Sequence, residues 1–204
     1  MKQFNEWLFE ISVSHGKDAH YSLVHWLHSN GMSDLFTEDY KAITYVVFQY
    51  HGGYGLIAKS CVPICHPIVE HNEFQLDLMK PIKVVVQLSV KKRIRTPNLK
   101  YELPKNLSSK NTIRTMTDLE KNERIHTVMN ELGFDSSSTT YEIHEGIDIP
   151  IHHKREKLFI LEPTMNVIFE GHITQPEKFD NAWKYGVGNK KVYGLGCVRI
   201  LHDE

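Results

Sequence analysis

The sequence lacks the excess of basic residues that marks many nucleic-acid-binding proteins. Its 24 lysines and arginines are balanced by 25 aspartates and glutamates, which gives a formal net charge of -1 at pH 7. A nucleic-acid partner would therefore have to be held by a local basic patch, because a nearly neutral protein can still carry concentrated fields. The shares of hydrophobic residues, 41 %, and charged residues, 24 %, are those of a globular protein.

Cysteine is scarce and its count is odd. Cys61, Cys65 and Cys197 are the three cysteines, which argues against a disulfide scaffold and for a reducing compartment. The segment 61–66 has the wrong spacing for haem attachment, and no second ligand pair for zinc accompanies it. We therefore expect neither a metal nor another cofactor, and we interpret these cysteines as core or strand residues.

Long hydrophobic runs are also absent. Near the N-terminus an acidic residue, Glu6, stands where a secretory signal peptide needs an apolar run. No window approaches the length of a membrane span. Together these absences predict a cytoplasmic protein.

The first 79 residues have the pattern of an α+β unit. Asp18 is placed to cap a helix that Gly31 ends, and the glycines in 51–54 predict a hairpin turn between two β-branched runs. The expected strands lie at 4–13, 42–49, 55–62 and 73–79. This order is a degraded version of the β-α-β-β-α-β ferredoxin-like unit.

From residue 80 the pattern restarts. Thr117 and Glu120 form a capping box that opens a helix ending at Gly133, and Pro176 begins a last helix that Gly186 ends. The expected strands lie at 82–90, with a basic extension at 91–95, at 143–151, at 157–173 with an interruption near Pro163, and at 192–201. Residues 96–115 are expected to form a loop. The sequence thus predicts two tandem ferredoxin-like (RRM-like) units, residues 1–79 and 80–204.

The segment 186–196 is rich in glycine and lies between the last helix and the last strand. Glycines permit positive φ and let backbone N–H groups approach a phosphate, and Lys190 and Lys191 supply counter-charge. The order of helix, loop and strand is opposite to that of a dinucleotide-binding site. A helix end followed by a tight turn is the alternative, but we favour RNA contact. The glycines concerned are Gly186, Gly188, Gly194 and Gly196.

With this loop and two tandem units, the chain resembles the CRISPR repeat-processing endoribonucleases, in particular the CasE type of Cascade and the related type IV enzymes. The resemblance runs nearly end to end. Its residues are the Gly-x-Gly-x-x-Lys-x-x-Gly-x-Gly loop at 186–196, His20 and Leu23, and the segments 73–76, 84–88, 120–134 and 169–171. It implies cleavage of CRISPR precursor RNA next to the repeat stem-loop without a metal. It also implies that the protein then stays on the mature CRISPR RNA, beside other subunits of a Cascade-like or type IV effector complex.

The resemblance implies that His20 is the central catalytic residue. Attack of a 2′-hydroxyl on the adjacent phosphate, giving a 2′,3′-cyclic phosphate and a 5′-hydroxyl, needs proton transfer and neutralisation of the phosphorane. His20 is expected in the first turn of its helix, where the macrodipole disfavours the imidazolium and attracts phosphate. Related proteins often have a tyrosine three residues earlier, where this chain has Lys17. Either Lys17 or Tyr21 is then expected to stabilise the phosphorane.

Two more basic clusters are candidates for RNA binding. In similar proteins a basic hairpin enters the groove of the repeat stem, where contacts recognise shape and phosphate. An ordinary solvated turn is the alternative for the first cluster. The candidates are Lys154, Arg155 and Lys157 in the first cluster and Lys91, Lys92 and Arg93 in the second.

Two other functions stay open. The pairs His20-x-Ser22 and His172-x-Thr174 match the His-x-Ser/Thr signature of two-histidine phosphoesterases, although those enzymes carry their histidines on strands. The non-enzymatic alternative is a subunit that binds CRISPR RNA without cutting it, which the missing tyrosine would explain.

Overall fold

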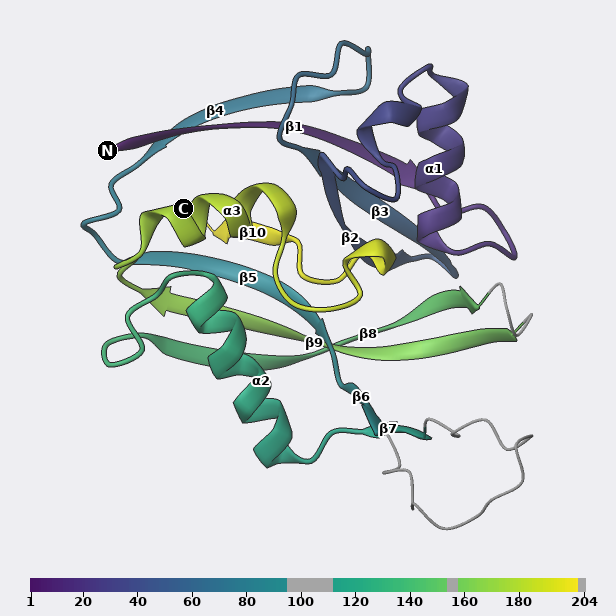
Figure 1. The fold of residues 1–204 in the computed structure, drawn as a ribbon. Coiled ribbons are helices and arrows are strands. Elements are labelled where there is room, and N and C mark those ends of the chain that lie inside the picture. Colours follow the sequence, from purple (N-terminus) through teal and green to yellow (C-terminus); the bar gives the residue numbers. More distant parts are fainter. Residues whose placement is uncertain (95–111, 154–157, 202–204) are drawn as a thin grey trace.

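The computed structural model describes residues 1–94, 112–153 and 158–201. Within these ranges the chain forms two four-stranded antiparallel sheets, a two-stranded ribbon and three α-helices (Figure 1). The first sheet is built from β1 (Lys2–Ser12), β2 (Ile43–Tyr50), β3 (Gly53–Ser60) and β4 (Glu70–Leu76). The second sheet is built from β5 (Ile82–Ser89), β8 (Thr140–His153), β9 (Leu158–Gly171) and β10 (Val198–Leu201).

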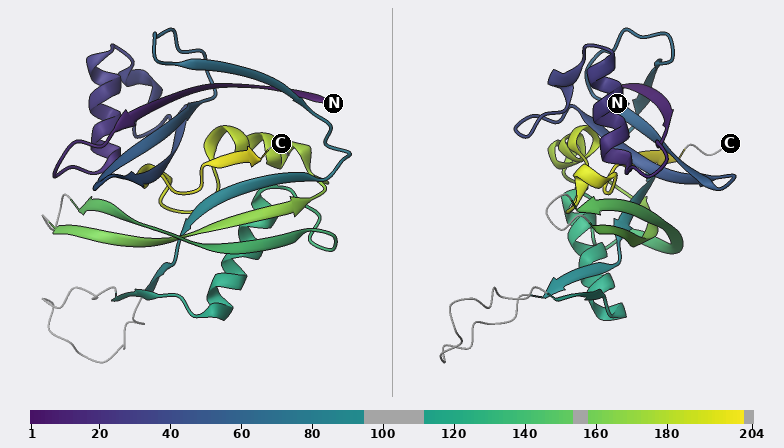
Figure 2. Two further views of the ribbon diagram at one scale, coloured as in Figure 1. Left: turned by 180° about the vertical axis from the view of Figure 1, so that it is seen from behind. Right: turned by 90° about the vertical axis from the view of Figure 1, so that its right-hand side faces the viewer.

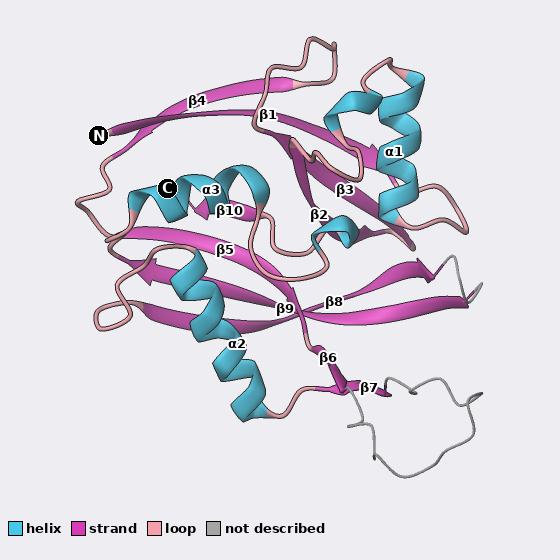
Figure 3. Ribbon diagram, in the orientation of Figure 1, coloured by secondary structure: helices cyan, strands magenta, loops and turns pink. Residues whose placement is uncertain are grey.

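The first sheet has the strand order β2-β3-β1-β4, which is that of a ferredoxin-like unit. Helix α1 (Ala19–Ser29) follows β1, and a short 3-10 helix, η1 (Ser33–Leu35), follows α1. A complete unit has a second helix before its last strand. Here the described residues 61–69 form an irregular connection instead (Figure 3), so the degraded unit that the sequence predicts is confirmed.

The second sheet has the equivalent order β10-β5-β9-β8 and both of the expected helices, α2 (Asp118–Glu131) and α3 (Pro176–Tyr185). The capping box of α2 is confirmed, because Thr117 and Glu120 each cap the other's backbone N–H. The predicted fold class, α+β with two tandem ferredoxin-like units, is therefore confirmed. No helix in the described ranges is long and apolar enough to cross a membrane.

Several predicted strand boundaries are wrong. β4 lies at 70–76 rather than 73–79, because its register is set by pairing with β1, which matches Phe4 with Phe74. Residues 112–115 form β7 (Thr112–Thr115), paired with β6 (Lys91–Ile94), where a loop was expected. The last strand is shorter than 192–201, since residues 191–193 form the 3-10 helix η2 (Lys191–Tyr193).

The predicted interruption at Pro163 falls on the other strand of the hairpin. β9 runs through Pro163 unbroken, and the irregularity lies in β8 between Glu145 and Asp148. Proline has no N–H to give to a ladder, so the partner strand bulges at this point. The hydroxyl of Thr164 then donates to the carbonyl of Ile147 at 2.7 Å.

Each half of the chain contributes side chains to the hydrophobic core of the other half. Phe4 of β1 belongs to the core formed mainly by the second sheet, α2 and α3. Ile149 and Ile151 of β8 belong to the core beneath α1 and the first sheet. The end of β8 and the start of β9 extend past β5, with which β9 pairs only at residues 164–171. This half of the β8–β9 hairpin runs beneath the first sheet (Figure 2). Residues 77–81 connect the sheets, and we propose that the boundary between the units lies there.

Candidate functional site

The start of α1 is tied to the end of β8 by a single buried carboxylate. Asp18 is the N-cap of α1, and its Oδ1 accepts a hydrogen bond from the N–H of Tyr21 at 2.8 Å. Its Oδ2 accepts one from the backbone N–H of His152 at 2.9 Å. Asp18 is 5 % exposed. The predicted cap is thus confirmed, and it also joins the two units at the positive end of a helix.

His20 is the second residue of α1 and is half-buried. Its ring lies 5.6 Å from the ring of Phe36, which follows η1. The position in the first turn is the one that the sequence predicts. A phosphate at this end of the helix would meet the positive end of the macrodipole.

Lys17 and Tyr21 lie together on an exposed face of this helix end. The Lys17 ammonium is 4.8 Å from the centroid of the Tyr21 ring, a cation–π contact. The other neighbour of Tyr21 is His25, whose ring stacks at 5.9 Å. The structure therefore brings the two candidates for phosphorane stabilisation side by side, whereas the ring of His20 lies against that of Phe36.

A buried tyrosine, Tyr45, and a half-buried one, Tyr193, lie near the Asp18 carboxylate. Tyr45 of β2 is 1 % exposed and donates its hydroxyl to the carbonyl of Val192 at 2.5 Å. Burial raises the pKa of Tyr45 well above its ordinary value, and the nearby Asp18 carboxylate adds to this effect. The pKa of Tyr193 in η2 is raised by the same two causes. Neither tyrosine was predicted from the sequence, where the position of Tyr193 inside the glycine-rich segment was the only signal.

The glycine-rich segment is folded against the protein. Its ends meet, since the N–H of Val187 donates to the carbonyl of Gly196 at 2.8 Å. Each of the four glycines has a φ between 68° and 83°. A Cβ on Gly196 would lie 1.9 Å from the Val187 oxygen, and one on Gly194 would lie 2.6 Å from the Tyr45 ring. Packing and backbone conformation thus already require glycine here, and RNA contact by this segment stays a prediction.

Both lysines of the segment have protein partners. Lys190 forms an ion pair with Glu162 of β9, whose side chain is 1 % exposed. The Lys191 ammonium donates to the carbonyl of Gly186 at 2.7 Å, and burial lowers its pKa. One backbone N–H is also occupied, because Gly188 donates to the Glu131 carboxylate at 2.6 Å.

Of the other basic candidates, one group lies in β6 and the other lies outside the described residues. Lys91 and Lys92 lie in β6; the Lys91 ammonium donates to the carbonyl of Leu161 at 2.8 Å, and that of Lys92 lies 3.1 Å from Glu120. Arg93 also lies in β6. Lys154, Arg155 and Lys157 stand between β8 and β9 in the sequence and lie outside the described residues.

The geometry gives little support to a metal site or to a two-histidine phosphoesterase. In the part of the chain that the structure describes, no group of three or more His, Cys, Asp or Glu side chains could hold a metal ion. His20 lies on a helix, whereas a two-histidine phosphoesterase requires it on a strand, and His172 follows the end of β9. The strand context of the His-x-Ser/Thr signature is therefore missing at His20.

Comparison with known proteins finds similarity in structure only. No protein-family model matches the sequence, and no curated protein matches it. The CRISPR-associated protein Cas6e from Escherichia coli K-12 has a TM-score of 0.57 and 18 % identity, over 95 % of this chain and 98 % of that chain. Thermus thermophilus Cse3, bound to an RNA representing a pre-cleavage complex, has a TM-score of 0.58 and 15 % identity, over 98 % of this chain and 100 % of that chain. A chain of a CRISPR RNA-guided surveillance complex has a TM-score of 0.57 and 14 % identity, over 95 % of this chain and 98 % of that chain. The chain thus shares the fold of these CRISPR-associated proteins over nearly its whole length.

Proposed function

We propose that this chain is a metal-independent endoribonuclease that cleaves CRISPR precursor RNA beside the repeat stem-loop. The fold shared with Cas6e and Cse3 supports this proposal. The observation that carries it is the position of His20, in the first turn of a helix whose cap residue, Asp18, is hydrogen-bonded to the second unit. A neutral imidazole at the phosphate-attracting end of a helix suits a general base.

The proposed reaction removes a proton from the 2′-hydroxyl and adds one to the leaving 5′-oxygen. His20 takes the proton of the 2′-hydroxyl, whose oxygen attacks the adjacent phosphorus. The bond from phosphorus to the 5′-oxygen breaks, and this oxygen leaves with a proton. The Lys17 ammonium, held against the Tyr21 ring, neutralises the charge that develops on the phosphorane.

RNA binding is proposed for basic residues outside the reacting centre. Two groups, Lys154, Arg155 and Lys157 between β8 and β9 and Lys91, Lys92 and Arg93 in β6, are proposed to contact phosphates of the stem. Lys190 and Lys191 belong to the same proposal, but these two, like Lys91 and Lys92, must first leave a protein partner. Their contribution to affinity is therefore expected to be smaller. Because such contacts survive cleavage, the product hairpin stays bound, and the protein remains on the guide RNA within an effector complex.

A labelled repeat-containing transcript tests the proposal. The purified protein is incubated with it in EDTA, and the ends of the products are mapped. We expect cleavage next to the stem, with a 2′,3′-cyclic phosphate and a 5′-hydroxyl. A transcript with 2′-deoxyribose immediately upstream of the cut should resist. Cleavage that stops in EDTA, or that proceeds on the deoxy substrate, would contradict this mechanism.

A non-cleaving CRISPR RNA-binding subunit is the second candidate. The observation in its favour is Lys17, since related nucleases often have a tyrosine there. The same experiment separates the two functions, because this subunit would retard the transcript in a gel without producing fragments.

A further inference from the structure

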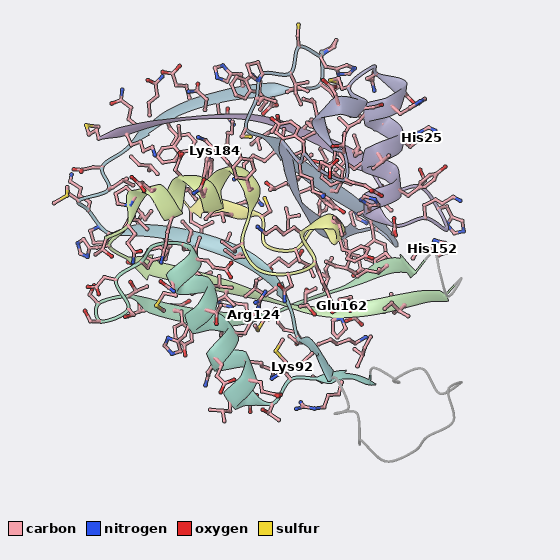
Figure 4. The ribbon with its side chains drawn as sticks, viewed as in Figure 1. His25, Lys92, Arg124, His152, Glu162 and Lys184 are labelled. Carbon is pink, nitrogen blue, oxygen red and sulfur yellow. The ribbon has the colours of Figure 1, made fainter. Side chains whose placement is uncertain are left out.

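A second imidazole stands at the same helix end as His20. We propose that His152 is the general acid that protonates the leaving 5′-oxygen; this inference rests on the proposed function. Figure 4 shows His152 at the end of β8, below the amino-terminal end of α1. Its backbone N–H reaches Asp18, which caps the helix two residues before His20.

The end of β8 is held firmly at this place. Ile149 and Ile151 are each 1 % exposed and pack in the core beneath α1 and the first sheet. Asp18 then fixes the next residue of the strand through its peptide group. The side chain of His152 is exposed, so a nucleic acid can reach it. A positioned and accessible imidazole is what general-acid catalysis requires.

Three other side chains near the helix start are less suited to this role. Asp18 is buried, and both of its carboxylate oxygens accept backbone N–H groups. Tyr45 is buried and donates to the Val192 carbonyl. Lys17 packs on the Tyr21 ring, where its positive charge suits the phosphorane better than proton transfer. His152 combines an imidazole with an exposed position.

The two histidines complete the proton balance of the reaction. His20 begins neutral and gains the proton of the 2′-hydroxyl. His152 begins protonated and gives its proton to the 5′-oxygen as the bond from that oxygen to phosphorus breaks. After cleavage His20 is protonated and His152 is neutral, and exchange with solvent restores both.

A substrate with sulfur in place of the bridging 5′-oxygen tests this assignment. A thiolate leaves without being protonated, so a defect in the general acid disappears on this substrate. His152→Ala should slow cleavage of the oxygen substrate about a hundredfold, the usual scale for one acid–base group. It should cleave the sulfur substrate at close to the wild-type rate. The variant keeps the backbone N–H that binds Asp18, so the helix cap is retained.

His20→Ala provides the comparison, because the loss of a general base persists on both substrates. His28→Ala, which removes an exposed imidazole from the last turn of α1, is the matched control and should behave as wild type on both. Normal cleavage of the oxygen substrate by His152→Ala would overturn the inference, and so would a defect that sulfur does not rescue. Rescue of His20→Ala instead would show that the two roles are reversed. If the wild-type protein cleaves neither substrate, it is the proposed function that fails.

Discussion

The ammonium of Lys190 pairs with the carboxylate of Glu162, which is 1 % exposed and also accepts a hydrogen bond from the hydroxyl of Ser89. This contact fastens the glycine-rich segment to the second sheet. A lysine placed between glycines therefore has a structural partner that its sequence neighbours do not reveal.

Breaking this pair from one side should destabilise the protein. Lys190→Met leaves a buried carboxylate without its counter-charge, and we expect the free energy of unfolding to fall by about 3 kcal/mol. Glu162→Gln should also destabilise. The double variant should lose less than the sum of the two, which a urea-unfolding cycle measures. Additive losses would show that the pair does not couple. Lys191→Met, whose ammonium donates to the Gly186 carbonyl, should cost less than Lys190→Met.

The salt dependence of RNA binding should distinguish the basic residues between β8 and β9 from those of the glycine-rich segment. Replacing Lys154 and Arg155 together by alanine should weaken the hairpin complex. The slope of log affinity against log salt should become shallower by roughly 1.4 to 1.8, because each lost phosphate contact removes about 0.7 to 0.9. Lys191→Met should change the slope by less than one contact. An unchanged slope for the double variant would mean that the segment is only a solvated turn.

His20→Ala should abolish cleavage while leaving hairpin affinity nearly unchanged. The residue acts on the transition state, so its loss should reduce the single-turnover rate about a hundredfold or more. Gel-shift titration of the same RNA provides the binding control. A wild-type cleavage rate in His20→Ala would contradict the catalytic role of His20. A loss of hairpin affinity as large as the loss of rate would show that His20 acts in RNA binding instead.

The cation–π pair of Lys17 and Tyr21 can be dissected with two variants. Lys17→Met removes the charge proposed to stabilise the phosphorane, and we expect a loss of about a hundredfold in the cleavage rate. Tyr21→Phe keeps the ring that holds the ammonium but removes the hydroxyl, so it should cleave at nearly the wild-type rate. A large defect in Tyr21→Phe together with an active Lys17→Met would give the role to the Tyr21 hydroxyl.

The buried Lys59 should make stability depend on pH in the alkaline range. It is 3 % exposed, donates to the Val198 carbonyl at 2.6 Å, and burial lowers its pKa from 10.5 to about 8. Between pH 8 and 10.5 the unfolded chain then binds more protons at Lys59 than the folded chain does. The contribution of Lys59 to the free energy of unfolding therefore rises with pH in this window.

Lys59→Met isolates this contribution. The difference in unfolding free energy between wild type and variant should grow in favour of wild type by about 1 to 2 kcal/mol from pH 8 to 9.5. Urea unfolding at both pH values measures it. Lys80→Met, at an exposed position in the connection 77–81, should show the same dependence of unfolding free energy on pH as wild type. A constant difference for Lys59→Met would show that the ammonium is not desolvated.

Local chemistry made much of the fold predictable. Asp18 and Thr117 cap the helices that their side chains predict, because capping depends on residues only a few positions away. The register of β4 depends instead on pairing with β1, almost 70 residues earlier in the chain, and so it was predicted three residues too late. β7 escaped prediction because its partner, β6, lies on the other side of a long polar segment.

The candidate site was predictable only in part, for the same reason. The position of His20 follows from the cap two residues before it. The contact between Asp18 and His152 spans 134 residues, and nothing in either segment indicates it. The glycines of 186–196 suggested a phosphate cradle, but their positive φ already favours glycine, and the Tyr45 ring and Val187 carbonyl leave no room for a Cβ on Gly194 and Gly196. Sequence pattern identifies which residues are unusual, whereas the tertiary contacts decide what they do.

The exchange of core residues has a consequence for how the molecule melts. Phe4 packs edge-on against Trp183 in the second core, and Ile149 and Ile151 fill the first. Each half of the chain thus lacks part of its own interior until the other half is folded. Calorimetry should therefore record one cooperative transition rather than two. Fragments obtained by dividing the chain within 77–81 should remain poorly folded alone and recover native spectra only when they are mixed.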